Sequence, residues 1–408
     1  MNGSITVSGT SGLQKCSFCV LLLSCIGFGV LSGNVGVLFR LACALFLLFF
    51  NNKTRTGKIQ IEKGKSLILF VFFLFRLWTY RDSNIFGLMI PFIDTFCLYV
   101  IFLINYKTIS SLTNTFVTCL TWISLISLIA WILFLFDIVI WPPRPLNYLG
   151  IYDFLDYGFF YKNELTFGLR FQSLFVEPGA YGILCVFAII LNGLKRDYKT
   201  LVFVSAIIFT ISLAAYVLLI TVFLYNSIVI RKRFISIFVI LAVVFGIIYI
   251  GLNYNGGDNV IYDSIFWRLA EKEDGTNALD ERSSDEAYAY YNRMPLSEKV
   301  VGIGGQKYQQ KRFESSVDLK SYILRDGYIG LFLFVTLFVL LTIHNKSKAR
   351  KERILLLLIY ALVFYRGFVF AINLGAIMLY YFMNNRQLLV KKDNYSSNGK
   401  NVVYSSSK

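Results

Sequence analysis

Long apolar runs separated by short charged segments dominate the chain. A helix needs about 20 predominantly apolar residues to cross the hydrocarbon layer of a membrane. Apolar runs close to this length lie at 16–32, 34–50, 66–80, 85–105, 114–140, 173–193, 234–252 and 327–343. Each of these runs predicts one membrane-spanning helix.

Two further apolar tracts, 200–230 and 354–383, have cationic residues at both of their ends. Cytoplasmic segments of membrane proteins collect Lys and Arg, so both ends of each tract are expected on the cytoplasmic side. A single crossing would place one end outside. Each tract is therefore interpreted as a hairpin of two short spans, which gives about 12 spans with both termini in the cytoplasm.

These spans define the expected organisation of an all-α polytopic membrane protein. A large extracytoplasmic loop precedes span 10. The expected segments are the first five helices in 1–140, an extracytoplasmic loop in 141–172, helices 6–9 with a short hairpin in 173–252, the large loop in 253–326, helices 10–12 in 327–383 and a cytoplasmic tail in 384–408.

Composition and charge support this interpretation. The chain is 56% hydrophobic and 16% charged, whereas soluble domains average about 25% charged residues, so most classes of soluble enzyme are excluded. The net charge of +16 would suggest nucleic acid in a soluble protein. The expected cytoplasmic segments hold 23 of the 40 cations and four acids. Membrane topology therefore explains the surplus, and no nucleic-acid partner is expected.

Cysteine and histidine give little sign of metal or disulfide chemistry. All seven cysteines lie in apolar runs, and the pair Cys16 and Cys19 lacks the second ligand pair or βαβ context of a metal or redox motif. The single His344 excludes a His-rich metal site. No metal and no cofactor are expected.

Six ionisable groups fall at membrane depth, where an Arg or Asp costs about 2.5–3.5 kcal/mol at the centre of a helix. They are Arg40, Arg76, Arg366, Asp94, Asp137 and Glu177. Glu177 is expected about two turns inside the sixth span, with Arg170 at its outer mouth. Pro178 and Gly179 would break this helix and free backbone groups for a polar cavity. A kinked helix with a structural Arg–Glu pair is the equally weighted alternative.

The large loop contains a second candidate segment, from Arg282 to Arg293, followed by a turn with Gly302 and Gly304. Such a turn can bind an anion by directing backbone N–H groups at it. A simple loop turn is the alternative, and a P-loop or dinucleotide motif is excluded by the missing strand and helix context.

Two further arginines, Arg325 at the start of the tenth span and Arg366 in the last hairpin, are expected near the same outer mouth. For Arg366, snorkelling of the side chain to the membrane interface is the alternative. Arginine binds phosphate through a fixed fork of donors. Several arginines and one carboxylate on the outer side thus suit a lipid pyrophosphate that is handled without a metal.

In the order of these features, the chain resembles the bacterial O-antigen polymerases and the related O-antigen ligases. The resemblance covers about 140–345 by motif and the whole chain by topology. The matching elements are Arg170 with Glu177-Pro178, Arg282 and Arg293, Gly302 and Gly304, and Gly327 with Gly330. Arg293 and Gly304 also fit an Arg-x10-Gly spacing, which Arg170 and Gly182 miss by one. Ligases usually carry a His near the position of Ser316, so the resemblance favours the polymerase.

The resemblance implies a membrane glycosyltransferase of the bacterial inner membrane, with its active site facing the periplasm. It would join undecaprenyl-pyrophosphate-linked oligosaccharide repeat units in lipopolysaccharide or related polysaccharide biosynthesis. Arg170, Arg282 and Arg293 would neutralise the departing pyrophosphate, and Glu177 would be the general base if burial raised its pKa toward neutrality. In a weaker interpretation Glu177 only orients an Arg. Gly302, Gly304, Arg325 and Arg366 would bind substrate.

Other functions remain open at this stage. A ligase would share the donor but transfer glycan to lipid A–core. A polysaccharide transporter or flippase would place its substrate near the membrane midplane and often shows two related halves, which this chain lacks. By the resemblance, a chain-length regulator and a flippase are expected protein partners, beside the lipid-linked oligosaccharide and membrane lipid.

Overall fold

The computed structural model describes most of the apolar runs and part of both loops. The described residues are 11–26, 28, 33–53, 62–104, 106–148, 152–163, 170–231, 245–246, 249, 252–254, 285–311, 319–344, 350–366 and 374–385. Arg282 and most of the expected span 234–252 lie outside them.

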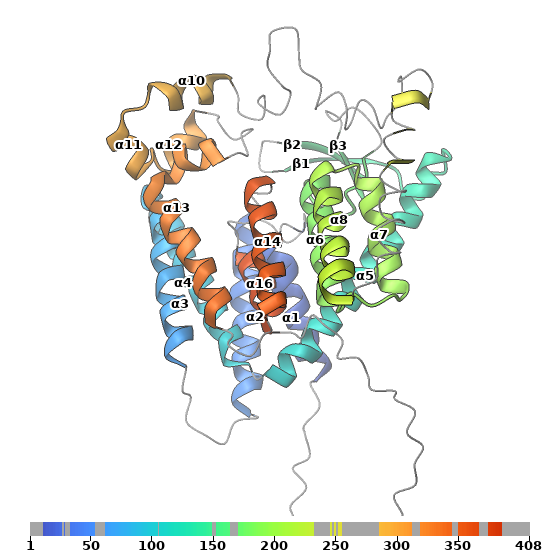
Figure 1. Ribbon diagram of the computed structural model, residues 1–408, viewed down its shortest axis with the longest axis horizontal. Coiled ribbons are helices and arrows are strands. Elements are labelled where there is room, and N and C mark those ends of the chain that lie inside the picture. Colours follow the sequence, from blue (N-terminus) through green and yellow to red (C-terminus); the bar gives the residue numbers. More distant parts are fainter. Residues whose placement is uncertain are drawn as a thin grey trace, which may run out of the picture.

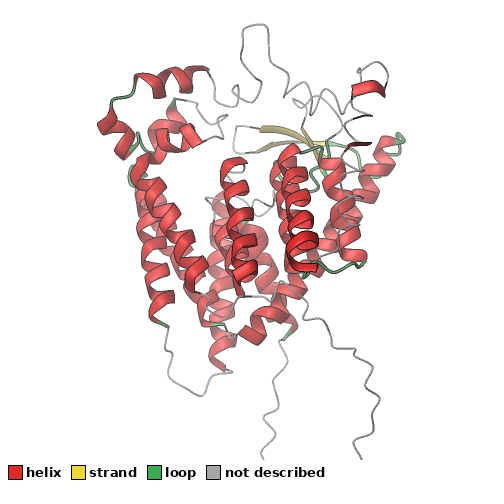
Figure 2. Cartoon of the chain, in the orientation of Figure 1, coloured by secondary structure: helices red, strands yellow, loops and turns green. Residues whose placement is uncertain are grey.

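The described structure is predominantly helical (Figure 2). The helices are α1 (Gly12–Cys25), α2 (Gly33–Lys53), α3 (Lys63–Thr79), α4 (Ile85–Leu103), α5 (Tyr106–Leu135), α6 (Pro178–Leu191), α7 (Tyr198–Thr210), α8 (Leu213–Tyr225), the π-helical η2 (Asn226–Arg231), α10 (Asp285–Arg293), α11 (Leu296–Val301), α12 (Gly305–Gln310), α13 (Leu319–His344), α14 (Arg350–Arg366) and α16 (Leu374–Asn385).

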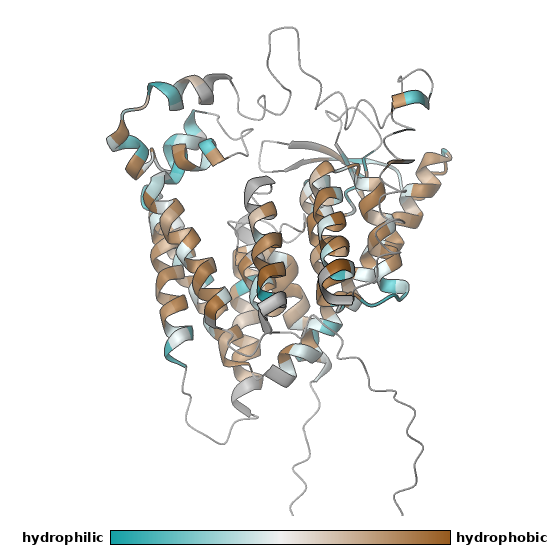
Figure 3. Ribbon diagram, viewed as in Figure 1, coloured by the Kyte–Doolittle hydropathy of each residue, from teal (hydrophilic) through white to brown (hydrophobic). Residues whose placement is uncertain are grey.

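Three of the described helices are long and apolar enough to cross a membrane. They cover Ile85–Leu103, Thr108–Leu135 and Leu319–Ile343. The structure also contains shorter apolar helices, among them α1, α6, α7 and α8. Most of the helical surface in Figure 3 is hydrophobic. A helix that is apolar all round belongs in a membrane or in the core of a large protein. The chain is accordingly a mostly helical membrane protein, while the expected total of 12 spans and their orientation stay predictions.

The helices stand side by side in three groups (Figure 1). Helices α3, α4 and α13 form one side, α5 to α8 form the other, and α1, α2, α14 and α16 lie between them in this view. Strands β1–β3 and helices α10–α12 lie at the same end of the helices. We call this end the loop face.

Helix α6 forms the centre of its group. Every residue from Tyr181 to Leu191 is buried, and the helix packs on α7, α8, α5 and α16. At Gly182 a Cβ atom would come within 2.7 Å of Ala215 Cβ and 3.1 Å of Thr210 Oγ1. Small residues let membrane helices approach closely, so Gly182 fixes α6 against the junction of α7 and α8.

The tract 200–230 is divided into two helices at Ile211, whose φ is 45°. A residue in this left-handed conformation cannot continue a right-handed helix, so α7 ends here. The conformation is costly for a residue other than glycine. Ser212 then caps α8, with its hydroxyl accepting from the backbone N–H of Ala215 at 3.4 Å. Residues 354–383 likewise contain two helices, α14 and α16.

The loop between α5 and α6, expected to be extracytoplasmic, contains a small sheet that the sequence pattern did not predict. Strands β1 (Arg144–Tyr148), β2 (Tyr152–Asp156) and β3 (Tyr161–Asn163) form an antiparallel meander in the order β1-β2-β3. The sheet is tied to the start of α6, since the N–H of Tyr161 donates to the carbonyl of Ser173 at 2.8 Å. The all-α expectation thus holds for the helical groups and not for this loop.

The connection between α6 and α7 is organised by Asp197. This residue caps α7 by accepting from the N–H of Thr200 at 3.1 Å, and it also accepts from the side chain of Asn192 at 2.8 Å. Partial burial alone would raise the pKa of Asp197, but the hydrogen bonds from Asn192 and Thr200 outweigh it and hold the pKa below its ordinary value of 3.8.

Replacing Asp197 with alanine should therefore lower stability by about 1 kcal/mol at neutral pH. A carboxyl whose pKa is lower in the folded state stabilises that state above its ordinary pKa and loses the effect as the pH falls through the folded value. The difference in Tm between wild type and Asp197→Ala should be constant from pH 7 to about 5 and should shrink below pH 4. A difference that does not depend on pH would contradict a role for the ionised carboxylate.

Candidate functional site

Arg170 is held at the loop face by the end of α7. Its Nε donates to the carbonyl of Thr210 at 3.1 Å, and the N–H of the next residue, Phe171, donates to the carbonyl of Phe209 at 2.9 Å. These two carbonyls belong to the last turn of α7, where backbone acceptors lack partners inside the helix. The break between α7 and α8 thus supplies the acceptors that position Arg170.

Glu177 was predicted to lie about two turns inside a helix, but the structure places it elsewhere. It is the N-cap residue of α6, and its side chain is exposed. Proline is favoured at the first position of a helix and disfavours helical geometry in the residue before it. Pro178 therefore starts α6 and does not break it. The prediction of a buried Glu177 was wrong, and burial no longer supports its role as a general base.

Arg170 and Glu177 are nevertheless brought to one corner. A Cβ atom on Gly179 would lie 3.2 Å from Glu177 Oε1 and 3.6 Å from Ser212 Oγ. The carboxylate therefore folds back over the first turn of α6 toward Ser212, two residues after the carbonyl that binds Arg170. We call Arg170, Glu177, Thr210 and Ser212 the α6 corner.

The other catalytic candidates lie elsewhere or outside the described residues. Arg293 is exposed at the end of α10, and Arg282 is among the residues that the structure does not describe. Arg366 is the last residue of α14, and its side chain is also outside the description. In Figure 1 helices α6–α8, which carry the α6 corner, and α10–α12 lie on different sides of the molecule, so the sequence elements that share the loop face do not form one compact site there.

Gly302 and Gly304 take part in a contact between the large loop and the α3–α4 turn. The predicted anion-binding turn does bind an anion, but the anion is the side chain of Asp82. Its carboxylate accepts from the N–H of Gly305 at 3.0 Å and from the N–H of Gln306 at 2.7 Å. Gly304 has a φ of +89°, and a Cβ atom there would clash with the same carboxylate.

Gly302 also has no room for a side chain, because the backbone of residues 325–327 lies against it. A Cβ atom at this position would lie 2.5 Å from both the carbonyl of Arg325 and the N–H nitrogen of Gly327. The N–H of Gly304 donates to the carbonyl of Arg325 at 2.9 Å. Two backbone segments thus cross in direct contact at Gly302 and Gly327, where only glycine fits.

Arg81 completes this contact from the α3–α4 turn. Its Nη2 donates to the carbonyls of Val301 at 2.7 Å and Gly302 at 2.9 Å, and its guanidinium stacks on Trp78, 4.6 Å from the ring centroid. Burial lowers the pKa of Arg81, an effect that Asp326 and Asp82 partly offset, yet an arginine stays protonated. We call the contacts of Arg81 and Asp82 with 301–306 the loop clasp.

Arg325 lies beneath the loop clasp and is paired within the protein. Its Nε and Nη2 reach Asp326 Oδ2 at 2.8 and 2.6 Å, and its side chain is 26% exposed. The carbonyl of Asp326 accepts from Trp78 Nε1 at 2.7 Å. Gly302, Gly304 and Arg325 therefore lie together, but their polar groups are largely used to attach the loop to α3 and α13.

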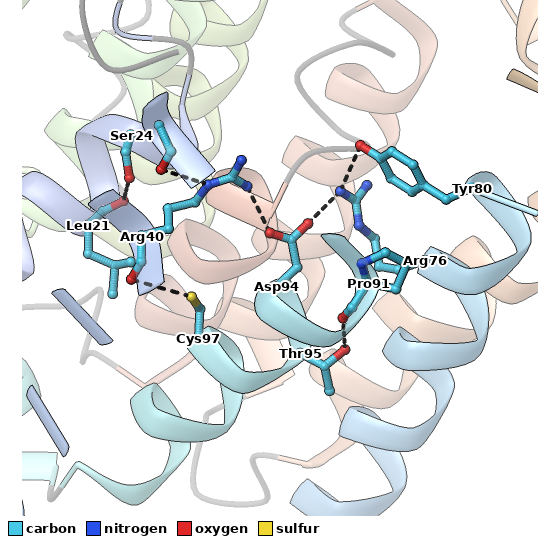
Figure 4. A network of polar contacts seen from close by, with 10 residues as sticks. Leu21, Ser24, Arg40, Arg76, Tyr80, Pro91, Asp94, Thr95 and Cys97 are labelled. Atoms are coloured by element: carbon cyan, nitrogen blue, oxygen red, sulfur yellow. Dashed lines mark hydrogen bonds and ion pairs between the residues drawn. The ribbon is translucent and has the colours of Figure 1, made fainter. Parts of the chain in front are cut away.

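A second group of charges was recognised in the sequence only as isolated residues at membrane depth. Arg40 of α2 and Arg76 of α3 both bind Asp94 of α4 (Figure 4). Arg40 Nη1 lies 2.8 Å from Asp94 Oδ1, and Arg76 Nη2 lies 2.5 Å from Asp94 Oδ2. Asp94 is fully buried, so this triad lies inside the helical groups. Arg76 Nη2 also donates to the hydroxyl of Tyr80 at 3.4 Å.

No grouping of metal-binding side chains occurs within the described ranges. Comparison with known proteins finds no family model, no curated relative and no solved structure that matches the chain. The functional assignment consequently depends on the α6 corner, the loop clasp and the charged triad.

Proposed function

We propose that the chain is a membrane glycosyltransferase that joins polyprenyl-pyrophosphate-linked oligosaccharide repeat units at the outer face of a bacterial inner membrane. The observation that carries this proposal is the α6 corner. An arginine and a carboxylate both lie at the junction of α7 and α8, at one end of apolar helices and on the same face as the described parts of the two long loops. This is where a lipid-anchored pyrophosphate and its glycan would meet the protein.

The reaction assigns one role to each charged group. The bond between the anomeric carbon of the donor glycan and its pyrophosphate breaks, and the acceptor hydroxyl forms the new glycosidic bond. Arg170 stabilises the charge that develops on the departing polyprenyl pyrophosphate. Glu177 takes the hydroxyl proton as the new bond forms, a step for which an exposed carboxylate needs no raised pKa because the hydroxyl becomes acidic during attack. The donor's lipid anchor keeps the leaving group in the membrane.

Arg170→Ala should stop the growth of long glycan chains. Loss of one group that stabilises developing charge typically lowers kcat by about 10²–10³. The measurement is the surface polysaccharide ladder of a strain that lacks the gene and carries the variant on a plasmid. Arg196→Ala is the matched control, because Arg196 is an exposed cation at the opposite end of α6. A correctly inserted Arg170→Ala protein that still makes long chains would refute the role of Arg170.

The same gels distinguish the nearest alternative. Deletion that leaves single repeats attached to lipid A–core indicates a polymerase. Deletion that removes all attached glycan, with long chains accumulating on the lipid carrier, indicates an O-antigen ligase.

A polysaccharide transporter is the second candidate, and the buried triad of Arg40, Asp94 and Arg76 favours it. Ionisable residues inside membrane helices often mark substrate pathways. Reconstituted protein separates the two functions, because a polymerase lengthens lipid-linked glycans in a single-sided detergent mixture and a transporter needs two compartments.

A further inference from the structure

The triad of Arg40, Asp94 and Arg76 contains more positive than negative charge. Two guanidinium groups share one carboxylate, and the three side chains come from neighbouring helices α2, α4 and α3. The side chain of Arg76 is 8% exposed and that of Arg40 is 14% exposed. Each guanidinium is paired with one oxygen of Asp94, but the three side chains together keep one positive charge. Buried charge that is not neutralised is costly, so this excess requires an explanation.

The surrounding charges do not supply the missing anion. Within the described structure the nearby acids are Asp326, which binds Arg325, and Asp82, whose carboxylate accepts the backbone N–H groups of the loop clasp. Asp326 is also within electrostatic range of Arg76 and Arg81. The cluster of four arginines and three aspartates therefore keeps an excess of one positive charge however the pairs are drawn.

The donors of the triad are also incompletely used. Asp94 has one oxygen bound to each arginine, and Arg40 Nε donates to the carbonyl of Gly36 at 3.3 Å. Arg76 Nε is buried and has no hydrogen-bond partner. A buried donor without an acceptor costs about 1–3 kcal/mol. The site therefore lacks both a negative charge and a hydrogen-bond acceptor.

We propose that Arg40 and Arg76 form a binding site for the phosphate group of a lipid-borne phosphate or pyrophosphate ester. Guanidinium forks match phosphate oxygens in geometry and charge. Arg76 lies in the last turn of α3, one turn before the loop face, and Tyr80 follows it. A phosphate that enters between the helices at this end would meet the slightly exposed guanidinium groups of Arg40 and Arg76, each of which binds one oxygen of Asp94.

The identity of the lipid deepens the proposed function and depends on it. A polymerase binds two lipid-linked substrates, and only the donor loses its pyrophosphate. Helices α3 and α4, which carry Arg76 and Asp94, lie on the other side of the molecule from α6–α8, which carry the α6 corner (Figure 1). We assign the triad to the pyrophosphate that the acceptor keeps throughout the reaction, which anchors the acceptor while its glycan extends along the loop face.

Arg40→Gln is the informative substitution, because it leaves Asp94 paired with Arg76 and makes the triad neutral. The variant should fold with a Tm close to that of wild type. Purified protein in phosphatidylcholine nanodiscs is titrated with farnesyl pyrophosphate, inorganic pyrophosphate or phosphatidylglycerol, and binding is measured by thermal shift. Wild type should bind farnesyl pyrophosphate, and Arg40→Gln should weaken binding by about tenfold or more, as the loss of one charged hydrogen bond implies. Arg196→Gln is the control and should bind as wild type does.

Each outcome of this titration decides one part of the proposal. Binding of farnesyl pyrophosphate that depends on Arg40 supports the site and its assignment to a polyprenyl substrate. A shift with phosphatidylglycerol alone that depends on Arg40 supports a phosphate site but overturns that assignment. Equal binding by wild type and Arg40→Gln, or a large loss of stability in Arg40→Gln without ligand, overturns the site itself. The measurement needs no glycan synthesis, so its failure is distinct from failure of the proposed reaction.

Discussion

Asp94→Ala should be one of the most destabilising single substitutions in the described structure, lowering the free energy of unfolding by about 3–5 kcal/mol. The side chain is fully buried and is the shared partner of Arg40 and Arg76. Its removal leaves two guanidinium groups facing each other inside the helical groups, with repulsion added to the loss of two ion pairs. The expected result is a marked fall in Tm and in the yield of monodisperse protein in mild detergent.

Thr95→Ala provides the matched control for this prediction. Thr95 is the next residue of the same helix, and its hydroxyl only donates to the carbonyl of Pro91 within α4, at 2.7 Å. This variant should change Tm little. Asp94→Asn keeps an acceptor but not the charge, so its Tm should lie between those of Asp94→Ala and wild type. An Asp94→Ala protein as stable as Thr95→Ala would contradict the triad as the tie between α2, α3 and α4.

Gly327→Ala should release the large loop from the helices. Gly327 has a φ of 71°, and a Cβ atom there would collide with Val300 and Val301 and lie 2.6 Å from the N–H nitrogen of Gly302. The left-handed conformation costs a residue with a side chain about 1–2 kcal/mol, and overpacking adds about 1–3 kcal/mol. The variant should show a lower Tm and rapid trypsin cleavage at Lys299, Lys307 and Lys311.

Gly193→Ala separates the two contributions. Gly193 has a similar φ of +78°, but a Cβ atom there meets nothing within 4 Å. This control therefore carries the conformational cost alone and should leave the trypsin sites of the loop protected. If Gly327→Ala and Gly193→Ala gave the same Tm and the same cleavage pattern, direct contact between the two backbone segments would not be what holds the loop.

The helices could be predicted from the sequence because each depends on the length of one continuous run of apolar residues. The run 85–105 became α4, Ile85–Leu103, and the tract 200–230 contains two helices as its flanking charges suggested. The sheet β1–β3 was missed because its strands are short and begin with a proline-rich stretch, which argues against a strand. Pro145 is tolerated because β1 is at the edge of the sheet.

The candidate site was predicted in part, and the errors have physical causes. The position of Glu177 was wrong because apolar residues before Pro178 were counted into the helix, although a proline at that place signals a start. Arg40, Arg76 and Asp94 were recognised as costly charges. Their pairing joins residues 54 and 18 positions apart, and no local pattern encodes which helices become neighbours. Asp82 was missed because a single Asp in a turn resembles any turn residue.

The spacing of the buried pairs has a consequence for how the chain enters the membrane. Arg76 and Asp94 lie on consecutive helices, so α3 and α4 can be inserted together as a hairpin whose two charges already cancel, which lowers the barrier to leaving the translocation channel. The loop clasp cannot form at this stage, since the N–H group that binds Asp82 lies 223 residues later in the chain. The α3–α4 turn therefore emerges with Arg81 and Asp82 still hydrated, and the contacts of the loop clasp form only after residues 301–306 have been synthesised.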